Sequence, residues 1–152
     1  MEKHKRTRII ISGIAVIIWM IVIFMFSAMV GDDSGNLSTI IVKTIFRNNT
    51  SIAESELAHI VVRKIAHMTE YAIFCLLIIN LEKQIGFKIR LKHILIGIII
   101  SCIYAMTDEY HQSFVNERSG NIIDVGIDTL GAAIAGIAVL IVSRFKNKEK
   151  DV

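Results

Sequence analysis

The sequence predicts an all-α integral membrane protein, a bundle of four transmembrane helices with cytoplasmic N- and C-termini and a polar site at the extracytoplasmic side. Three observations support this fold class. The chain is 53% hydrophobic with a mean hydropathy of +0.58, above the range of ordinary soluble domains. Apolar segments recur four times, and basic residues gather in alternate loops. The length of 152 residues suits one domain covering residues 1–152.

The first predicted span covers residues 9–30, which carry no charge. As a helix this segment would extend about 33 Å, enough to cross a hydrocarbon core of about 30 Å. The alternative is a cleaved signal peptide, but the apolar run is long for one and no clean cleavage site follows. In the polar loop 31–58, Leu37, Ile41 and Ile45 recur at helical spacing. They predict a short helix that either lies on the membrane surface or is covered by the protein.

The remaining predicted spans are 60–81, 91–106 and 122–142. The second belongs to a longer helix beginning near residue 52, and its first half is rich in ionisable groups. The third is short unless Lys92 and His93 extend toward the headgroups. The fourth carries Gly131 and Ala135 on the same helical face as its two aspartates, and such small residues let a neighbouring helix approach closely.

The basic residues predict the orientation of these spans. The N-terminal segment, the 82–92 loop and the C-terminal segment each hold four lysines or arginines. The other two loops hold two (Lys43 and Arg47) and one (Arg118). Basic loops stay in the cytoplasm, so both termini are expected there. The short, scattered basic clusters suit lipid headgroups and do not indicate a nucleic-acid partner.

This orientation brings the ionisable residues of three segments to one depth near the outer face. They are Arg63, Lys64, His67, Glu70, Asp108, Glu109, His111, Gln112 with its polar amide, Arg118, Asp124 and Asp128. A central charged group costs roughly 2.5–3.5 kcal/mol on insertion scales, so these groups should face one another or a hydrated pocket. A purely structural ion-pair network is the alternative to a functional site.

The charges of this set do not balance. Three cations face five carboxylates, which leaves two negative charges and two histidines of undecided protonation. Protonated histidines, protonated acids or a bound divalent cation would each restore the balance. His67-x-x-Glu70 and Asp108-x-x-His111 each place two potential ligands on one helical face, and oxygen-rich ligation would favour Mg, Mn or Ca over Zn. Cofactor identity therefore stays open. Cys75 and Cys102 lie in apolar runs and are interpreted as buried free thiols.

Several motifs closely resemble the signature of VanZ-like membrane proteins. They are Arg63-Lys64-x-x-His67-x-x-Glu70-Tyr71, then Asp108-Glu109-x-His111-Gln112-x-Phe114-Val115-x-x-Arg118, then Asp124-x-x-x-Asp128-x-x-Gly131, with Phe26-Ser27 closing the first span. The resemblance covers most of the chain in order. Two departures occur: Asn116-Glu117 replaces the family's usual Pro-Gly before the arginine, and Asp128 stands where many relatives carry Asn.

The resemblance implies a multi-pass protein of the bacterial plasma membrane that acts in the cell envelope. The founding member is linked to low-level resistance to teicoplanin, an antibiotic that binds peptidoglycan precursors outside the cell. The family's biochemical activity is unsettled, so antibiotic resistance is one expected role and envelope maintenance is another.

Two functions fit the residues. The first is an enzyme acting on an anionic envelope lipid or lipid-linked peptidoglycan precursor. Its catalytic candidates are His67, Glu70, Asp108, Glu109 and His111, and its substrate-binding candidates are Arg63, Lys64, Gln112, Arg118, Asp124 and Asp128. Ser113 is the nearby hydroxyl but is weak evidence for a nucleophile, so water or a substrate hydroxyl is favoured. The second is a non-catalytic binder that masks an envelope component or glycopeptide-related ligand.

Overall fold

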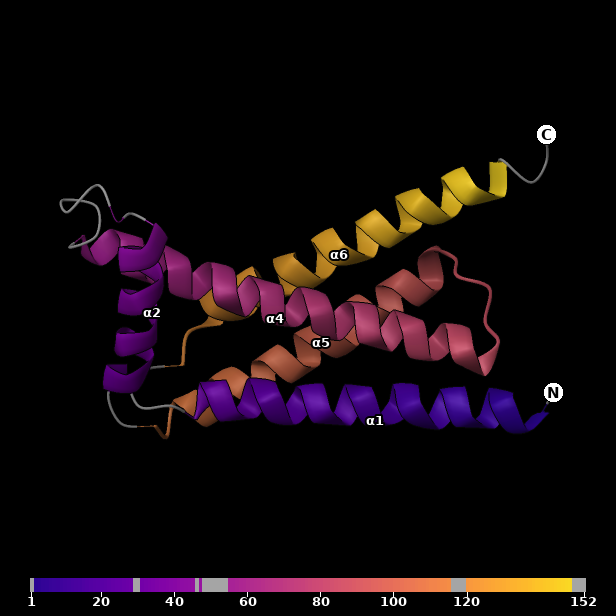
Figure 1. The fold of residues 1–152 in the computed structure, drawn as a ribbon, viewed down its shortest axis with the longest axis horizontal. Helices are drawn as coiled ribbons and strands as arrows, with labels where there is room; N and C mark the ends of the chain where they lie inside the picture. The colour runs from indigo at the N-terminus through magenta and orange to yellow at the C-terminus, as the bar shows by residue number, and fades with distance from the viewer. Residues whose placement is uncertain (1, 29–30, 46, 48–54, 116–119, 149–152) are drawn as a thin grey trace.

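The computed structural model describes residues 1–152 except 1, 29–30, 46, 48–54, 116–119 and 149–152, and it gives only the backbone of 31–37 and 146–148. All regular secondary structure in the described part is α-helical, with no strand. Its five helices are α1 (Glu2–Ser27), α2 (Gly31–Ile45), α4 (Glu56–Ile85), α5 (Leu91–Gln112) and α6 (Ile122–Lys148) (Figure 1). All except α2 contain a segment long and apolar enough to cross a membrane. The predicted all-helical architecture with four candidate spans is therefore confirmed.

Helix α4 is the centre of the bundle, because it contacts all four other helices. Helix α6 packs on α4 and α5, whereas α1 packs mainly on α4. Helices α4 and α6 begin, and α5 ends, at the same end of the bundle, which we call the polar end (Figure 1). Helix α1 begins and α6 ends at the opposite end of the bundle (Figure 1).

Glycine brings α4 and α6 into unusually close contact. A Cβ atom added at Gly131 would lie 2.2 Å from the carbonyl oxygen of Met68, well inside van der Waals distance. Ala132 and Ala135 are also buried on α6. The sequence-based expectation that Gly131 and Ala135 permit close helix approach is confirmed. This contact sets which face of α6 is turned toward α4.

Two hydrogen bonds join α1 to its neighbours at adjacent residues. The Trp19 indole N–H donates to the Glu70 carbonyl oxygen of α4 at 2.9 Å. The Tyr104 hydroxyl of α5 donates to the Met20 carbonyl oxygen at 2.7 Å. Both bonds lie next to an apolar core of buried side chains from all four long helices: Ile23, Tyr71, Phe74, Ile78, Ala105 and Val125.

Helix α2 confirms the predicted short helix between the first two spans. It lies across the bundle at the polar end, roughly perpendicular to the long helices (Figure 1). Ser38 and Val42 are buried, and Ser38 Oγ lies 3.4 Å from His59 Nδ1 of α4. Ile40 and Ile45 are exposed on the other sides of the helix. One face is therefore covered by protein, while apolar side chains remain on the surface.

The turn between α4 and α5 corrects one expectation about the third span. Gly86 ends α4 in the left-handed conformation (φ 120°), which favours glycine. His93 was expected to extend toward headgroups with Lys92, but its side chain is buried. It stacks on Phe87 and its Nδ1 lies 3.4 Å from Glu82 Oε1. Of these two residues only Lys92 is exposed. Helix α5 also extends six residues beyond the predicted end at residue 106, to Gln112. The Glu82 carboxylate of α4 thus provides a polar partner for the buried His93 ring.

Candidate functional site

Four carboxylates gather inside the polar end of the bundle. Asp128 of α6 is 1% exposed, and Asp108 and Glu109 of α5 are 3% and 7% exposed. Asp128 interacts electrostatically with both of these residues and with Glu70 of α4. We call Glu70, Asp108, Glu109 and Asp128 the acidic cluster. Close carboxylates in a low-dielectric interior repel one another strongly, which makes such a cluster unfavourable for stability alone.

The polar surroundings hold two of these carboxylates in place. Gln112 Nε2 donates to Asp108 Oδ2 at 3.2 Å, one helical turn away. The Ser27 hydroxyl at the end of α1 also interacts with the Asp108 carboxylate. The backbone N–H of Asn121 donates to Glu109 Oε2 at 2.8 Å. The site therefore receives contributions from all four long helices, including α1, whose contribution the sequence analysis did not anticipate.

Both predicted histidines lie beside the acidic cluster. His67 Nδ1 is 3.7 Å from Glu70 Oε2, as the one-turn spacing on α4 predicts. His111 packs its ring against Phe24 of α1, with ring centroids 4.5 Å apart. Both histidines interact electrostatically with Asp108. The arrangement pairs two groups that can carry a proton with carboxylates that can orient them.

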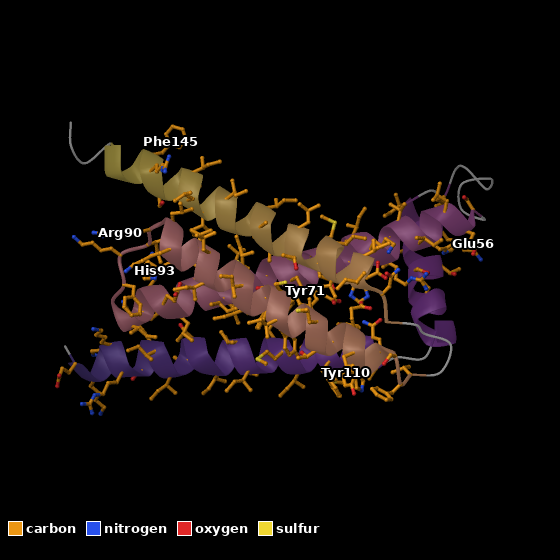
Figure 2. The ribbon with its side chains drawn as sticks, turned by 180° about the vertical axis from the view of Figure 1, so that it is seen from behind. Glu56, Tyr71, Arg90, His93, Tyr110 and Phe145 are labelled. Atoms are coloured by element: carbon orange, nitrogen blue, oxygen red, sulfur yellow. The ribbon has the colours of Figure 1, made fainter. Side chains whose placement is uncertain are left out.

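Tyr71 is a site residue that sequence reasoning missed. Its ring is fully buried inside the bundle (Figure 2). Its hydroxyl has no hydrogen-bond partner among the described residues, yet it interacts electrostatically with Asp108 and Asp128. Asp128 Oδ2 is likewise buried without a hydrogen bond to that part of the chain. The sequence signal that could have identified Tyr71 was its spacing from His67. Tyr71 follows His67 by four residues, so the two side chains share one face of the helix.

The predicted cations are distributed differently from the acids. Lys64 Nζ forms an ion pair with Asp124 Oδ1, linking α4 to α6. This pair is partly exposed, at 40% and 34% of the two side chains. Arg63 is exposed and forms no ion pair with any residue the structure describes. Arg118 lies outside the described residues. The structure thus brings Lys64 and Asp124 together near the acidic cluster and leaves Arg63 on the surface.

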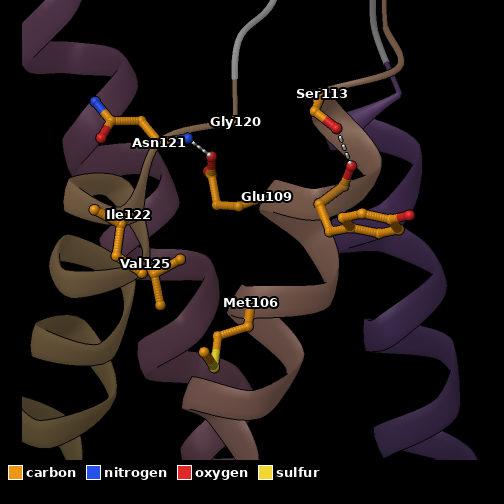
Figure 3. Close-up of a pocket in the computed structure, with 8 residues that line it drawn as sticks. Met106, Glu109, Ser113, Gly120, Asn121, Ile122 and Val125 are labelled. Atoms are coloured by element: carbon orange, nitrogen blue, oxygen red, sulfur yellow. Dashed lines mark hydrogen bonds between the residues drawn. The ribbon is translucent and has the colours of Figure 1, made fainter.

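A groove of about 260 Å³ lies between the end of α5 and the start of α6 (Figure 3). From the α5 side it is lined by Met106, Glu109, Tyr110 and Ser113. From the α6 side it is lined by Gly120, Asn121, Ile122 and Val125. A Cβ atom added at Gly120 would lie 2.3 Å from the Glu109 carbonyl oxygen, so only glycine lets the chain pass this close to α5. Glu109 belongs both to this groove and to the acidic cluster.

The described side chains do not form a metal centre. No three His, Cys, Asp or Glu residues in the described ranges are arranged to hold a metal ion. The predicted ligand pairs, His67 with Glu70 and Asp108 with His111, are each formed on one helix, but a third ligand does not join either of them.

Comparison with known proteins identifies a family. The family model described as VanZ/LLP1 matches residues 13–144, which includes every candidate site residue. No curated protein and no solved structure shows a significant match to the chain. The matched range begins within α1 and finishes within the last turns of α6, so it contains the acidic cluster, the groove and most of all four long helices.

Proposed function

Because the chain belongs to the VanZ/LLP1 family, we propose that it acts on an anionic cell-envelope lipid or lipid-linked peptidoglycan precursor at the outer leaflet of the bacterial plasma membrane. Envelope maintenance and resistance to glycopeptides such as teicoplanin are the cellular roles that this activity would serve. The observation that carries the proposal is the burial of three carboxylates, Asp108, Glu109 and Asp128, beside a groove at one end of a helical bundle. Glu70 and the two histidines lie next to them and are half-buried. Ionisable groups at membrane depth are costly and typically functional.

The distribution of basic residues supports an outer-leaflet location. The described parts of the three segments that hold four lysines or arginines each lie at the end of the bundle opposite the acidic cluster (Figure 1). The positive-inside rule assigns that end to the cytoplasm. The acidic cluster would then lie near the outer headgroups, where lipid-linked precursors are exposed before they are used.

The proposed chemistry is general acid–base catalysis of hydrolysis or group transfer. Imidazole exchanges a proton near neutral pH, so His67 or His111 can take a proton from water or a substrate hydroxyl. The oxygen then attacks the phosphorus or carbonyl carbon, and the proton returns to the oxygen of the departing group. Glu70 lies 3.7 Å from His67 and can orient its ring, and Asp108 interacts electrostatically with both histidines. Tyr71 supplies a buried hydroxyl beside Asp108 and Asp128.

Lys64 is the described cation best placed to receive an anionic group. It is already paired with Asp124, but an ammonium group has three donors, so it can hold a phosphate oxygen as well. Arg63 precedes it on the exposed side of α4. Ser113 does not resemble an activated nucleophile, because its exposed hydroxyl donates to the Tyr110 carbonyl oxygen. Water or a substrate hydroxyl remains the favoured nucleophile.

A non-catalytic binder is the second candidate. The observation that favours it is that Asp108 and Glu109 are held by structural groups, the Gln112 amide and the Asn121 backbone. Carboxylates held in this way could position a ligand without moving protons. In that function, loss of the cation at Arg63 or Lys64 would weaken ligand capture more than any change in the acidic cluster.

The two candidates are separated by profiling envelope lipids and peptidoglycan precursors by mass spectrometry. Four strains are compared: wild type, no copy, Glu109→Gln and Glu56→Gln, with the three proteins at equal abundance. Glu56 is the matched control, since it is an exposed glutamate in the first turn of α4. Catalysis predicts a species that changes with wild type and Glu56→Gln but not with Glu109→Gln. Identical profiles in all strains would contradict catalysis and leave the binder.

A further inference from the structure

The lining of the groove between α5 and α6 changes from polar to apolar along the bundle axis. Glu109, Ser113 and Asn121 surround its end near the loop, whereas Met106 and Val125 lie one helical turn deeper (Figure 3). The polar groups would thus sit at headgroup level and the apolar side chains in hydrocarbon. A lipid that stands upright in the membrane has the same order of polar and apolar parts.

We propose that this groove holds the sugar ring of a glycosylated envelope lipid, with the first part of its hydrocarbon chain along Met106 and Val125. The inference rests on the proposed function and names the substrate class of that site. The charged part of such a lipid, where present, would be met by Lys64 on the α4 side of α6 rather than within the groove.

The polar end of the groove suits hydroxyl groups better than phosphate. Glu109 is its one acidic side chain, and no lysine or arginine of the described chain lines it. A carboxylate can accept about four hydrogen bonds, so Glu109 can accept from a sugar hydroxyl in addition to the Asn121 backbone. The Asn121 side chain uses its oxygen to cap the start of α6, accepting from the Ile123 N–H at 3.0 Å.

An aromatic rim next to these groups favours a ring over a flexible polyol. Tyr110 is 70% exposed and meets Phe114 edge to face, with ring centroids 5.1 Å apart. Aromatic faces carry negative charge density and therefore attract the polarised C–H groups on one face of a sugar. The groove volume of about 260 Å³ lies just below the range of pockets for drug-sized ligands, which suits a single sugar unit.

The groove can be reached from the lipid side. Tyr110 and Ile122 stand on its two edges and are each at least 70% exposed. In a membrane these side chains would meet the surrounding lipids directly. A lipid could therefore enter by sliding sideways between α5 and α6 without leaving the bilayer.

The test uses the full-length protein in phosphatidylcholine nanodiscs, with native mass spectrometry measuring lipid retention. The probes are a monoglucosyl-diacylglycerol, the matching diacylglycerol and phosphatidylglycerol. The glucosyl lipid carries the sugar without charge, so it isolates the groove from any role of Lys64. We expect it to be retained more tightly than diacylglycerol and phosphatidylglycerol. Equal retention of the glucosyl lipid and diacylglycerol would overturn the proposal. Equal retention of phosphatidylglycerol and the glucosyl lipid by the Lys64→Ala protein would also overturn it, because phosphatidylglycerol offers glycerol hydroxyls without a ring and its charge has lost this partner.

Variants locate the binding site. Met106→Trp should fill the apolar end and weaken glucosyl-lipid binding by about tenfold, the scale expected from expelling one or two chain methylenes. Met25→Trp is the matched control, because Met25 is 64% exposed on α1 and does not line the groove, and it should leave binding unchanged. Tyr110→Ala removes an exposed ring that the fold does not need and should also weaken binding. Equal binding by all three variants would place the lipid elsewhere.

The outcomes also separate this inference from the proposed function. A Glu109-dependent change in the cellular lipid profile, without retention of the glucosyl lipid, would overturn the sugar assignment alone. Groove-dependent retention of the glucosyl lipid with no change in the cellular lipid profile would contradict the catalytic proposal and support the lipid-binding site.

Discussion

Replacing Gly131 by alanine tests the close contact on which the position of Asp128 depends. The new Cβ atom would lie 2.2 Å from the Met68 carbonyl oxygen and within 3.0 Å of two further backbone atoms of Met68. An ordinary contact needs 3.4 Å or more, so α4 and α6 would have to separate locally by roughly 1 Å. Helix backbones cannot yield as a flexible side chain can. Overpacking of this kind typically costs about 1–3 kcal/mol.

Gly126 provides the matched control on the same helix. A Cβ atom added there meets nothing within 4 Å. Both substitutions gain about 0.5–1 kcal/mol, because alanine loses less backbone entropy than glycine in a helix. The difference between the variants therefore isolates the clash. We expect the free energy of unfolding of Gly131→Ala to fall about 1–3 kcal/mol below that of Gly126→Ala.

The measurement is reversible unfolding of the purified variants in mixed micelles with increasing SDS, followed by circular dichroism. The same preparations would be assayed for lipid retention, since α4 and α6 both carry site residues. Equal unfolding free energies for the two variants, or a more stable Gly131→Ala, would show that the α4–α6 contact is looser than described. The assignment of Asp128 to the buried cluster would then lose its structural support.

Two further predictions concern electrostatics and orientation. A double-mutant cycle of Lys64→Ala and Asp124→Ala should give a coupling energy of about 0.2–1 kcal/mol, because the pair is partly exposed. A coupling of several kcal/mol in the unfolding assay would instead indicate a fully desolvated pair. In a background without Cys75 and Cys102, Phe114→Cys should react with a membrane-impermeant thiol reagent in intact cells, and Lys88→Cys should not. Both positions are exposed, and the reverse pattern would place the acidic cluster on the cytoplasmic side.

The helices could be predicted from the sequence because each depends on a local pattern. A charge-free run predicts α1 without any knowledge of its neighbours. The one-turn spacing of His67 and Glu70 determines their proximity on α4. Gly131 likewise signals a close helix contact before the partner helix is known. In each case the period of the α-helix carries the information.

The features that could not be predicted depend on how separate segments meet. The groove exists because the chain near Gly120 passes against the Glu109 carbonyl, a contact that no local pattern specifies. The choice of Asp124 as the partner of Lys64 depends on the rotation of α6. Tyr71 belongs to a motif quoted for the family resemblance, but its link to the acidic cluster emerges only when the structure places Asp108 and Asp128 near its hydroxyl. His93 was misjudged because its partner, Glu82, lies on the preceding helix.

The paired hydrogen bonds from Trp19 and Tyr104 have a mechanical consequence. They join α1 to α4 at Glu70 and to α5 one turn before Asp108. Helix α1 therefore fixes the axial position of α4 relative to α5, two helices that carry carboxylates of the acidic cluster. Sliding α4 past α5 by one turn would move their carboxylates apart by about 5.4 Å. In hydrocarbon, where water cannot replace them, the two broken bonds would oppose that movement. Helix α1, which contributes neither carboxylate, therefore helps to fix the positions of Glu70 and Asp108 relative to each other along the bundle axis.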